Sequence, residues 1–362
     1  MLTLAGDVML GRGIDMIQAH PGDPEIHESW ARSALSYVEL AEERSGPIPR
    51  QVPPSYVWGS LLATIRDPAS DAVIVNLETA VTDRGRPWPG KGIQYRMHPS
   101  NLDVLTAAGV DVVSLANNHV LDWSEAGLHQ TLDSLRTAGI VGVGAGEDSD
   151  RAWRPTRLDL PIGGLVIASV GTVGSGIPSD WAARSDSPGV ALLTDFSTKT
   201  IDRVGAAIDG VRRPGDVVVV SIHWGGNWGY GVATSRRRFA RRLIERSGAH
   251  VIHGHSSHHP VGIEVHRGCL ILYGCGDLIT DYEGISGHDR YRGDLGGLYR
   301  VGMTSTGLLT ELSIVPTRMQ RFRLTPPSEA DTEWLATSLD RACRPFGTKV
   351  SVDGEGLLRL SW

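Results

Sequence analysis

The chain has 362 residues, and its 35 basic and 41 acidic side chains give a formal net charge of −6. This slightly acidic balance argues against a general polyanion-binding surface, so we expect no nucleic-acid partner. No apolar run reaches the roughly 20 residues that cross a bilayer, and the N-terminus lacks the basic and apolar regions of a signal peptide. Three cysteines without a C-x-x-C pair fit a reducing compartment. We therefore expect a cytoplasmic protein with no membrane partner.

Short β-branched runs alternate with amphipathic stretches over the first two thirds of the chain. The runs predict strands at 2–6, 72–77, 111–115, 140–143, 165–171, 216–222 and 249–253. Periodicity predicts helices at 58–66, 99–108, 124–138, 198–212 and 235–247. Strands with continuous apolar character are typical of α/β folds, in which helices cover the sheet.

After residue 260 the pattern changes. It predicts successive antiparallel strands at 261–266, 269–273, 296–303 and 307–316, and a last helix at about 328–344. We expect one domain over 1–362, an α/β fold of two packed sheets with helices outside, and a C-terminal helical segment, 326–362, packed on it. Long polar segments are expected to wall a substrate cleft, at 18–57, 82–98, 174–195 and 281–295.

Five predicted strands end in side chains that can bind a cation or move a proton. These ends are Gly6-Asp7, Asn76-Leu77-Glu78, Asn117-Asn118-His119, His223, and the cluster of His253, His255, His258 and His259. In α/β sheets, ligands bind where loops converge at the carboxyl ends of strands. One polar residue at such an end is usually a helix cap or a turn former, but five together predict a shared site.

The motifs around these strand ends follow one another in a recognisable order. They are GDVMLGR (6–12), NLETAVT (76–82), SLANNHVLDW (114–123), SIHWGGNWGY (221–230), GHSSHHPVGIE (254–264) and LYGCGDLITDYEG (272–284). The set resembles the calcineurin-like metallophosphoesterase superfamily, specifically its capsule-synthesis branch, the CapA or poly-γ-glutamate synthesis proteins. The resemblance implies a calcineurin-like four-layer αββα sandwich of two mixed sheets. It also implies a metal centre at Asp7, Glu78, Asn118, His223, His255 and His258.

Two departures from the superfamily pattern affect the metal. Asp7 is followed by Val8 and Met9 where the superfamily has Asp-x-His, and Asn76-Leu77-Glu78 replaces Gly-Asp-x-x-Asp. Losing an imidazole while keeping oxygen donors favours one divalent hard cation (Ca²⁺, Mg²⁺ or Mn²⁺) over a tight two-metal centre. No motif for an organic cofactor is visible, so we expect none.

Fewer metal bonds leave histidines free to carry protons. His119 and Asp122 are three residues apart at a predicted helix start, so both side chains can lie on one face. A carboxylate beside an imidazole fixes its tautomer and raises its basicity. The simpler alternative is that the aspartates only cap helices or loops. A second pair of the same kind is predicted from His255 or His258 with Asp277, or with Asp281.

Loops near the motifs are expected to bind substrate. Basic side chains there can bind a carboxylate or phosphate, and aromatic ones suit an apolar or peptide substrate, although they also commonly pack the loop itself. The candidates are Arg12, Lys91, Tyr95, Arg96, Trp224, Trp228 and Tyr230.

These parts suit metal-assisted proton transfer at a peptide Cα. The chain looks like the soluble tryptophan epimerase type of lasso-peptide biosynthesis, which implies an isomerase with a ribosomal precursor peptide as substrate. Its His/Asp pairs would remove and return the Cα proton, with a cation stabilising the enolate. The alternatives are a metallophosphoesterase-like hydrolase, a soluble poly-γ-glutamate capsule biosynthesis protein, or a non-enzymatic binding protein.

Overall fold

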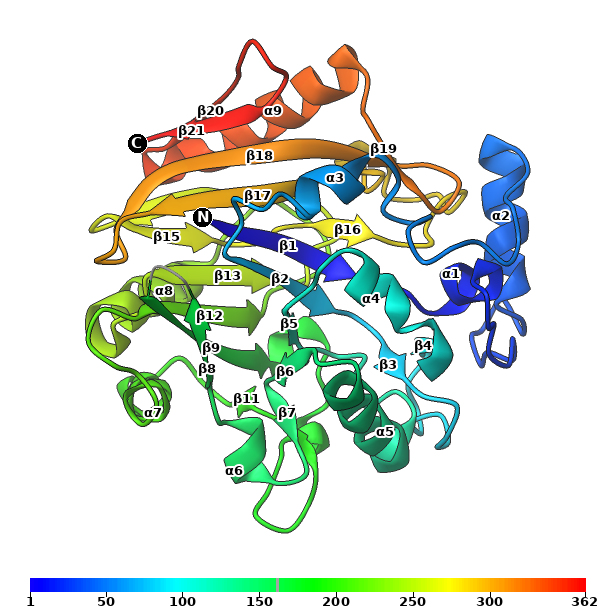
Figure 1. Ribbon diagram of the computed structural model, residues 1–362, viewed down its shortest axis with the longest axis horizontal. Helices are drawn as coiled ribbons and strands as arrows, with labels where there is room; N and C mark the ends of the chain where they lie inside the picture. Colours follow the sequence, from blue (N-terminus) through cyan, green and yellow to red (C-terminus); the bar gives the residue numbers. More distant parts are fainter. Residues whose placement is uncertain (161–162) are drawn as a thin grey trace.

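Two large mixed sheets form the centre of the molecule, which the computed structural model describes over residues 1–160 and 163–362 (Figure 1). In spatial order the first sheet contains β20 (Lys349–Val352), β21 (Leu358–Ser361), β18 (Leu309–Met319), β17 (Leu295–Met303), β1 (Leu2–Val8), β2 (Ala72–Leu77), β5 (Val112–Ser114) and β6 (Val141–Val143). Beside this path, β16 (Asp277–Ile279) pairs with β1 and β19 (Leu324–Thr325) pairs with β18.

The second large sheet lies against the first. It contains β11 (Leu192–Leu193), β9 (Gly163–Thr172), β12 (Val217–His223), β13 (Val251–His255), β15 (Cys269–Leu272) and β14 (Ile263–His266), with β8 (Thr156–Leu160) beside β9. Two small ribbons complete the described strands: β3 (Ala80–Val81) with β4 (Arg96–Met97), and β7 (Ala145–Gly146) with β10 (Gly189–Val190).

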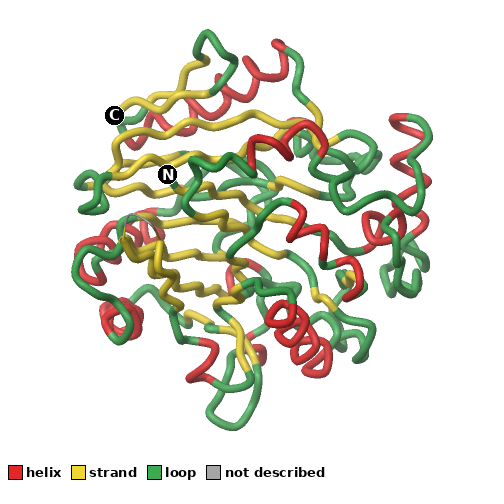
Figure 2. Tube along the Cα trace, in the orientation of Figure 1, coloured by secondary structure: helices red, strands yellow, loops and turns green. Residues whose placement is uncertain are grey.

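Helices lie around the margins of the strands (Figure 2). They are α1 (Arg12–Ile17), α2 (Leu35–Ser45), α3 (Leu62–Ile65), α4 (Asp103–Ala107), α5 (Ser124–Thr137), α6 (Ser149–Ala152), α7 (Thr198–Asp209), α8 (Thr234–Ser247) and α9 (Glu329–Cys343). Each strand and helix predicted from the sequence has a counterpart, and all but the strand at 72–77 have shifted ends. The prediction of a mixed α/β fold is confirmed.

The two large sheets face each other across an aliphatic cluster. Leu4 and Ile74 of the first sheet and Ile167, Val219 and Leu272 of the second belong to this cluster. Because side chains alternate along a strand, the neighbouring residues of each strand point the other way, toward the helices. On those outer faces, helices α4 and α5 share a cluster with the first sheet, and helices α7 and α8 share one with the second.

Strand β1 breaks this alternation at the position that matters most for the site. Leu2 and Leu4 face the second sheet, whereas Ala5 and Val8 belong to the outer cluster. The pairing of β1 with β2 is irregular between Leu4 and Asp7. A bulge of one residue changes which side of the sheet the following side chains occupy. Asp7 therefore faces the second sheet, as Leu4 does, although the two are three positions apart.

Three features differ from the sequence predictions. Strands β14 and β15 form an antiparallel pair, but β15 also joins β13 in parallel, so the C-terminal strands divide between two sheets. Segment 18–57 contains helix α2, which buries only Tyr37, Val38 and Ala41 and so shows a weak apolar stripe. Segment 326–362 contains helix α9 followed by strands β20 and β21, which extend the first sheet (Figure 1).

Candidate metal centre

The apolar interface between the sheets becomes polar toward the carboxyl ends of the strands. Ser114 Oγ of the first sheet lies 2.6 Å from Ser169 Oγ of the second. His253 Nδ1 lies 3.1 Å from Ser221 Oγ, and His253 Nε2 lies 2.8 Å from the Ala5 carbonyl oxygen. Because a carbonyl oxygen only accepts, Nε2 carries the proton. His253 is therefore a hydrogen-bonded link between the sheets.

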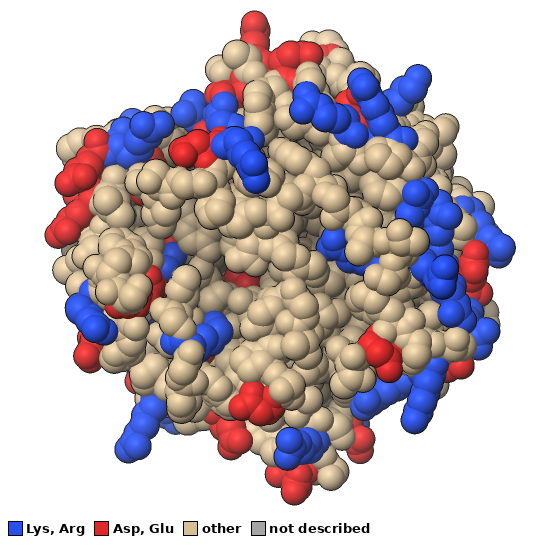
Figure 3. All heavy atoms as spheres, turned by 180° about the vertical axis from the view of Figure 1, so that it is seen from behind, with Lys and Arg blue, Asp and Glu red and all other residues tan. Residues whose placement is uncertain are grey.

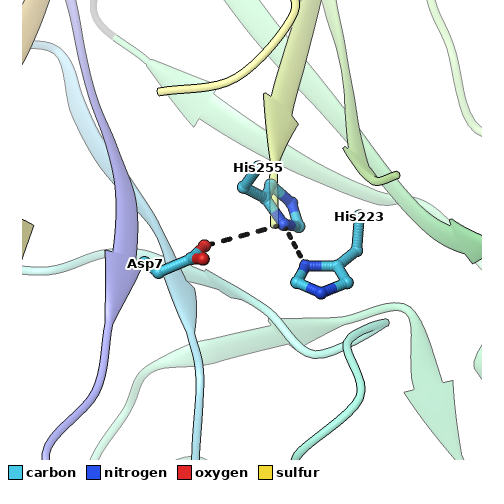
Figure 4. Close-up of side chains that lie close together, drawn as sticks. All are labelled: Asp7, His223 and His255. Atoms are coloured by element: carbon cyan, nitrogen blue, oxygen red, sulfur yellow. Dashed lines mark hydrogen bonds and ion pairs between the residues drawn. The ribbon is translucent and has the colours of Figure 1, made fainter. Parts of the chain in front are cut away.

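One step further along the strands, Asp7, His223 and His255 come together (Figure 4). His223 ends β12, His255 ends β13, and the two are register partners. Their Nδ1 atoms lie 2.8 Å apart, and His255 Nδ1 lies 4.0 Å from Asp7 Oδ1. All three side chains are buried, and each offers a ligand atom within 4.8 Å of the others. This group can supply two nitrogens and one oxygen to a single ion.

Asp7 also belongs to a second group of possible ligands, with His258 and Asp277. Strands β1 and β16 are parallel neighbours with Asp7 opposite Asp277, so the two carboxylates leave the sheet side by side. His258 Nδ1 lies 3.1 Å from each oxygen of Asp277. Asp7 is common to both groups. A carboxylate in that position could bridge two ions, one held by each group.

Two asparagines hold the acidic side chains in place. Asn76 Nδ2 donates to Asp7 Oδ1 at 2.7 Å, and it also donates to Glu78. Asn117 Nδ2 in turn donates to Asn76 Oδ1 at 3.0 Å. Outer hydrogen bonds of this kind orient metal ligands and tune their affinity. Asn76 therefore acts as a support for Asp7 and Glu78.

Glu78 and Asn118 approach the outer edge of the His223 ring. Asn118 Oδ1 lies 2.8 Å from His223 Nε2, and Glu78 Oε1 lies 3.7 Å from the same nitrogen. Glu78 Oε1 is also 3.9 Å from His119 Nε2. Glu78 thus lies between the ligand group and His119.

The charges of the centre fit a cation. Asp7 Oδ2 is buried and has no hydrogen-bond partner among the residues that the structure describes. Burial and the nearby Asp277 raise the pKa of Asp7 to about 8, and burial and Asp7 raise the pKa of Glu78 well above its usual range. Three buried carboxylates repel one another, and a divalent cation would offset this repulsion while binding the free oxygen.

The imidazoles differ in their protonation. Burial lowers the pKa of both His223 and His255, so their rings are neutral near pH 7 and can offer lone pairs to a metal. His258 is also buried, which by itself lowers its pKa, but the adjacent Asp277 raises it above its ordinary value. The first two rings suit ligation, whereas His258 beside its carboxylate can also hold a proton.

His119 forms a separate acid–base pair with Asp122. Its Nδ1 lies 2.6 Å from Asp122 Oδ2, and the same carboxylate accepts the Tyr95 backbone N–H at 2.6 Å and a bond from Lys91. Because an ionised carboxylate only accepts, Nδ1 donates its proton to Asp122 Oδ2 across this short contact, and Nε2 keeps the lone pair. Burial and Lys91 lower the pKa of His119 to about 4. His119 is therefore a neutral base.

Aromatic rings flank both His119 and His258. Tyr95 stacks on His119 with 3.7 Å between ring centroids, and its hydroxyl lies 2.5 Å from that of Tyr282. Tyr282 and Trp228 in turn contact His258, with centroids 5.1 and 5.2 Å away. Of the predicted substrate-binding residues, Lys91, Tyr95 and Trp228 thus contact the centre.

Arg12, predicted to bind substrate, is instead buried at 3% exposure. Its guanidinium pairs with Glu28 at 2.8 Å and with both oxygens of Asp281, and it donates to the Tyr37 hydroxyl at 2.6 Å. Asp281, which the sequence suggested as a partner for His255 or His258, instead binds Arg12. A buried guanidinium requires such partners to offset its desolvation, so Arg12 and Asp281 form a structural ion pair.

Three other predicted substrate-binding residues are used for packing. Trp224 is 1% exposed and donates its indole N–H to a backbone carbonyl at 3.0 Å. Arg96 lies over Trp123, with 3.7 Å from Cζ to the ring centroid. Tyr230 packs edge-on against His259 at 4.6 Å. Trp224 packs in the apolar cluster on the outer side of β12. The sequence of the loop does not indicate this contact.

Asn76 and Asn117 were predicted only as members of strand ends that can bind a cation, without the supporting role described above. Ser221 and Tyr282 were not predicted. Ser221 precedes His223 by two positions on the same face of β12, so strand periodicity could have indicated it. Tyr282 lies in a loop without periodicity, and nothing local indicates its contact with His258.

The chain matches a known protein family over most of its length. The family model described as bacterial capsule synthesis protein PGA_cap matches residues 1–282, so the chain belongs to this family. Proteins from two strains of Mycobacterium tuberculosis, both named "Probable polyglutamine synthesis accessory protein", are 45% identical over 362 residues, which cover 99% of this chain and 95% of each relative. The PGA biosynthesis protein CapA of Bacillus subtilis is 28% identical over 280 residues, covering 77% of this chain and 63% of that protein.

The resemblance to the capsule-synthesis branch is confirmed by this family match. The names of these relatives refer to polymer synthesis, and none of them refers to a lasso peptide or an epimerase. Within the described ranges, 1–160 and 163–362, no helix combines the length and apolar character of a membrane span.

Proposed function

We propose that the chain is a metal-dependent hydrolase that acts on an amide-linked polymer of glutamate or glutamine type during its synthesis. The observation that carries this proposal is the position of Asp7. Its Oδ2 is buried without a partner among the described residues, where two groups of ligand side chains meet. Such a junction suits one or two divalent cations.

The donor set suggests which cation. Carboxylate oxygens favour Ca²⁺, Mg²⁺ and Mn²⁺, whereas imidazole nitrogens favour transition metals. Asp7 with His223 and His255 offers both kinds of atom. Of the three hard cations expected from the sequence, Mn²⁺ accepts this mixture best. A bound divalent cation would polarise a substrate carbonyl and acidify a water molecule.

The protein side chains supply the proton steps. His119, whose Nε2 is free, can accept a proton from the attacking water, and Asp122 with Lys91 keeps the ring in the required tautomer. His258, hydrogen-bonded to Asp277, can return a proton to the leaving amide nitrogen. Water attack forms the new carboxyl group while the C–N bond breaks, so the amine leaves with one proton gained.

The polymer part of the proposal comes from the relatives. The Mycobacterium proteins are named for polyglutamine synthesis and the Bacillus protein for PGA biosynthesis. Cleavage of such a polymer would set its length or release it, which is a role that an accessory protein of synthesis can have. The proposed partner is the polymer itself.

Epimerisation at Cα is the second candidate. It is favoured by the two separate His/carboxylate pairs, His119 with Asp122 and His258 with Asp277, because proton removal and return need one group on each face of the carbon. The same pairs serve hydrolysis, so the two reactions are separated by isotopes rather than by geometry.

The experiment is incubation of the purified protein and Mn²⁺ with short glutamine and γ-glutamate oligomers, in H₂¹⁸O and separately in D₂O. Hydrolysis places one ¹⁸O in each new carboxyl group and shortens the chain. Epimerisation places deuterium at Cα with the chain intact. If neither label enters while the protein holds its metal, both candidates are wrong. Asp7→Asn is the control, and it should abolish labelling with an unchanged circular dichroism spectrum.

We also propose that the fold is the calcineurin-like four-layer sandwich that the resemblance implies. The cluster shared by both large sheets supports an inner pair of layers. The outer clusters, which join α4 and α5 to the first sheet and α7 and α8 to the second, support the outer pair. Alignment of an experimental structure with that fold would test this arrangement.

A further inference from the structure

A cavity of about 580 Å³ adjoins the candidate metal centre. Trp228 and Tyr282 line it, and the same two rings contact the imidazole of His258. The volume lies in the range of about 300–1,000 Å³ that is usual for ligand sites. Thr280, another lining residue, follows Asp277 by three positions, so the cavity continues the line of β16 beyond the centre.

Two polar atoms of the lining have no partner. Thr280 Oγ1 and Glu283 Oε1 are both buried, and neither has a hydrogen bond within the described ranges of the chain. Buried polar atoms are nearly always hydrogen-bonded, because leaving one unpaired costs free energy. Both atoms can accept a hydrogen bond, and an amide N–H is the donor that a peptide chain offers at every residue.

The charges around the cavity are close to balanced. Among its lining residues, Arg292 and Arg318 form ion pairs with Asp294 and Asp331. The remaining basic side chain of the lining, Arg44, stands against two acidic ones, Glu283 and Asp289. The cavity therefore has no excess positive charge with which to bind a row of carboxylates.

Basic side chains on the surface outside the site also have acidic neighbours. Lys and Arg gather near one margin of the face seen from behind, with acidic side chains among and around them (Figure 3). On helix α8, Arg237 and Arg241 pair with Glu264, and Arg246 pairs with Asp202. Two carboxylates, Glu264 and Asp202, thus offset part of the charge of the six arginines of this helix.

We infer that the cavity beside His258 is a subsite for an uncharged, amide-bearing chain of glutamine type, and that it disfavours glutamate carboxylates. The inference rests on the proposed function and defines its substrate class. Both oxygens are closed to the cavity in this structure, so a rotation of each side chain would bring Thr280 Oγ1 and Glu283 Oε1 to amide N–H groups of the bound chain, while Trp228 and Tyr282 cover its methylene groups. A glutamate chain would bring its carboxylates toward Glu283 and Asp289 without enough cations to offset the repulsion.

The test is a binding measurement that does not depend on turnover. Acetylated and amidated pentaglutamine and pentaglutamate are titrated into the metal-free wild-type protein by calorimetry. Pentaglutamine is expected to bind at least about 10-fold more tightly than pentaglutamate. Equal affinities, or tighter binding of pentaglutamate, would overturn the inference even if the protein hydrolyses either chain.

Three variants assign the preference to the cavity. Thr280→Val removes the hydroxyl at nearly constant shape and should weaken pentaglutamine binding about 10-fold, whereas Thr280→Ser should restore it. Glu283→Gln keeps an acceptor oxygen but removes the charge, so it should strengthen pentaglutamate binding and narrow the difference. An unchanged preference in both Thr280→Val and Glu283→Gln, with melting temperatures near wild type, would contradict the subsite.

The inference and the proposed function can fail separately. A protein that binds pentaglutamine with these variant effects but incorporates no ¹⁸O retains the subsite and loses the hydrolase proposal. In the opposite case, wild type and Thr280→Val hydrolyse a dipeptide-sized amide at the same rate, and the protein shows no preference between the pentamers. That result would support the hydrolase proposal and contradict the subsite.

Discussion

His119 Nδ1 lies 2.6 Å from Asp122 Oδ2, and this carboxylate also accepts bonds from Lys91 and the Tyr95 backbone. Asp122 thereby fixes which nitrogen of His119 is free. Asp122→Asn would keep the shape but let the ring adopt the other tautomer. We expect kcat to fall by about 10²–10⁴-fold with Mn²⁺ affinity unchanged, measured by ¹⁸O incorporation and calorimetry. An unchanged kcat would remove His119 from the mechanism.

We predict that cation binding depends on Asp7. Asp7→Asn removes the negative charge where the two ligand groups meet, so we expect stoichiometric Mn²⁺ binding to be lost. The measurement is metal analysis after dialysis, together with calorimetric titration. Asp133→Asn is the matched control, because Asp133 is exposed and pairs only with Arg136 among the described residues. Full metal occupancy in Asp7→Asn would show that the centre lies elsewhere.

Asn76 should affect the metal indirectly. Its amide donates to both Asp7 and Glu78, so Asn76→Ala would leave these carboxylates without their common support. We expect Mn²⁺ affinity to fall by about 10–100-fold, less than for Asp7→Asn. Calorimetric titration of both variants under the same conditions gives the order. If Asn76→Ala bound the ion as tightly as wild type, its bond to Asp7 would be irrelevant to the site.

Arg12 should matter for stability rather than for substrate. Arg12→Met leaves Glu28 and Asp281 buried without their counter-charge, which we expect to lower the free energy of unfolding by about 3–5 kcal/mol. Arg96→Met is the comparison, since within the described ranges Arg96 has one acidic partner, Asp23 at 4.0 Å, and its replacement should cost about 1 kcal/mol or less. Urea denaturation checks both. If the Arg12→Met protein were as stable as wild type and had a raised KM, Arg12 would be a substrate-binding residue and not a structural one.

Asp331 gives a pH dependence of stability. The burial of this carboxyl opposes ionisation, but its bonds with Arg292 and Ser328 dominate and lower its pKa to about 2. A carboxyl with a depressed pKa in the folded state stabilises the protein above its unfolded pKa of about 4, and this contribution is lost as the pH falls toward 2.

Asp331→Asn should therefore lower the free energy of unfolding at pH 7 by about 1 kcal/mol. The difference from wild type should shrink between pH 4 and pH 2, because the carboxyl of the unfolded wild-type chain is protonated below about pH 4 and that of the folded chain only near pH 2. Thermal unfolding at several pH values measures it. A difference that stays constant from pH 7 to pH 2 would mean that the charge of Asp331 does not stabilise α9.

The local sequence determined the elements and most of the site. Apolar runs and helical periodicity depend on neighbouring residues, and they located the strands that end in Asp7, Glu78, His223 and His255. Because parallel strands bring their carboxyl ends to one edge, chain order alone predicted that these side chains meet. The same patterns missed α2, whose apolar stripe is narrow among charged residues.

Only the tertiary structure decided how these side chains are used. The irregularity in β1 turns Asp7 toward the second sheet, and pairing with β16 places Asp277 beside it, 270 positions later in the chain. Arg12 meets Asp281 across 269 positions and becomes buried, although its sequence context is that of an available cation. Local patterns determine which residues can react. Burial and long-range pairing determine which of them remain free to do so, because desolvation makes each buried charge take a partner wherever the fold supplies one.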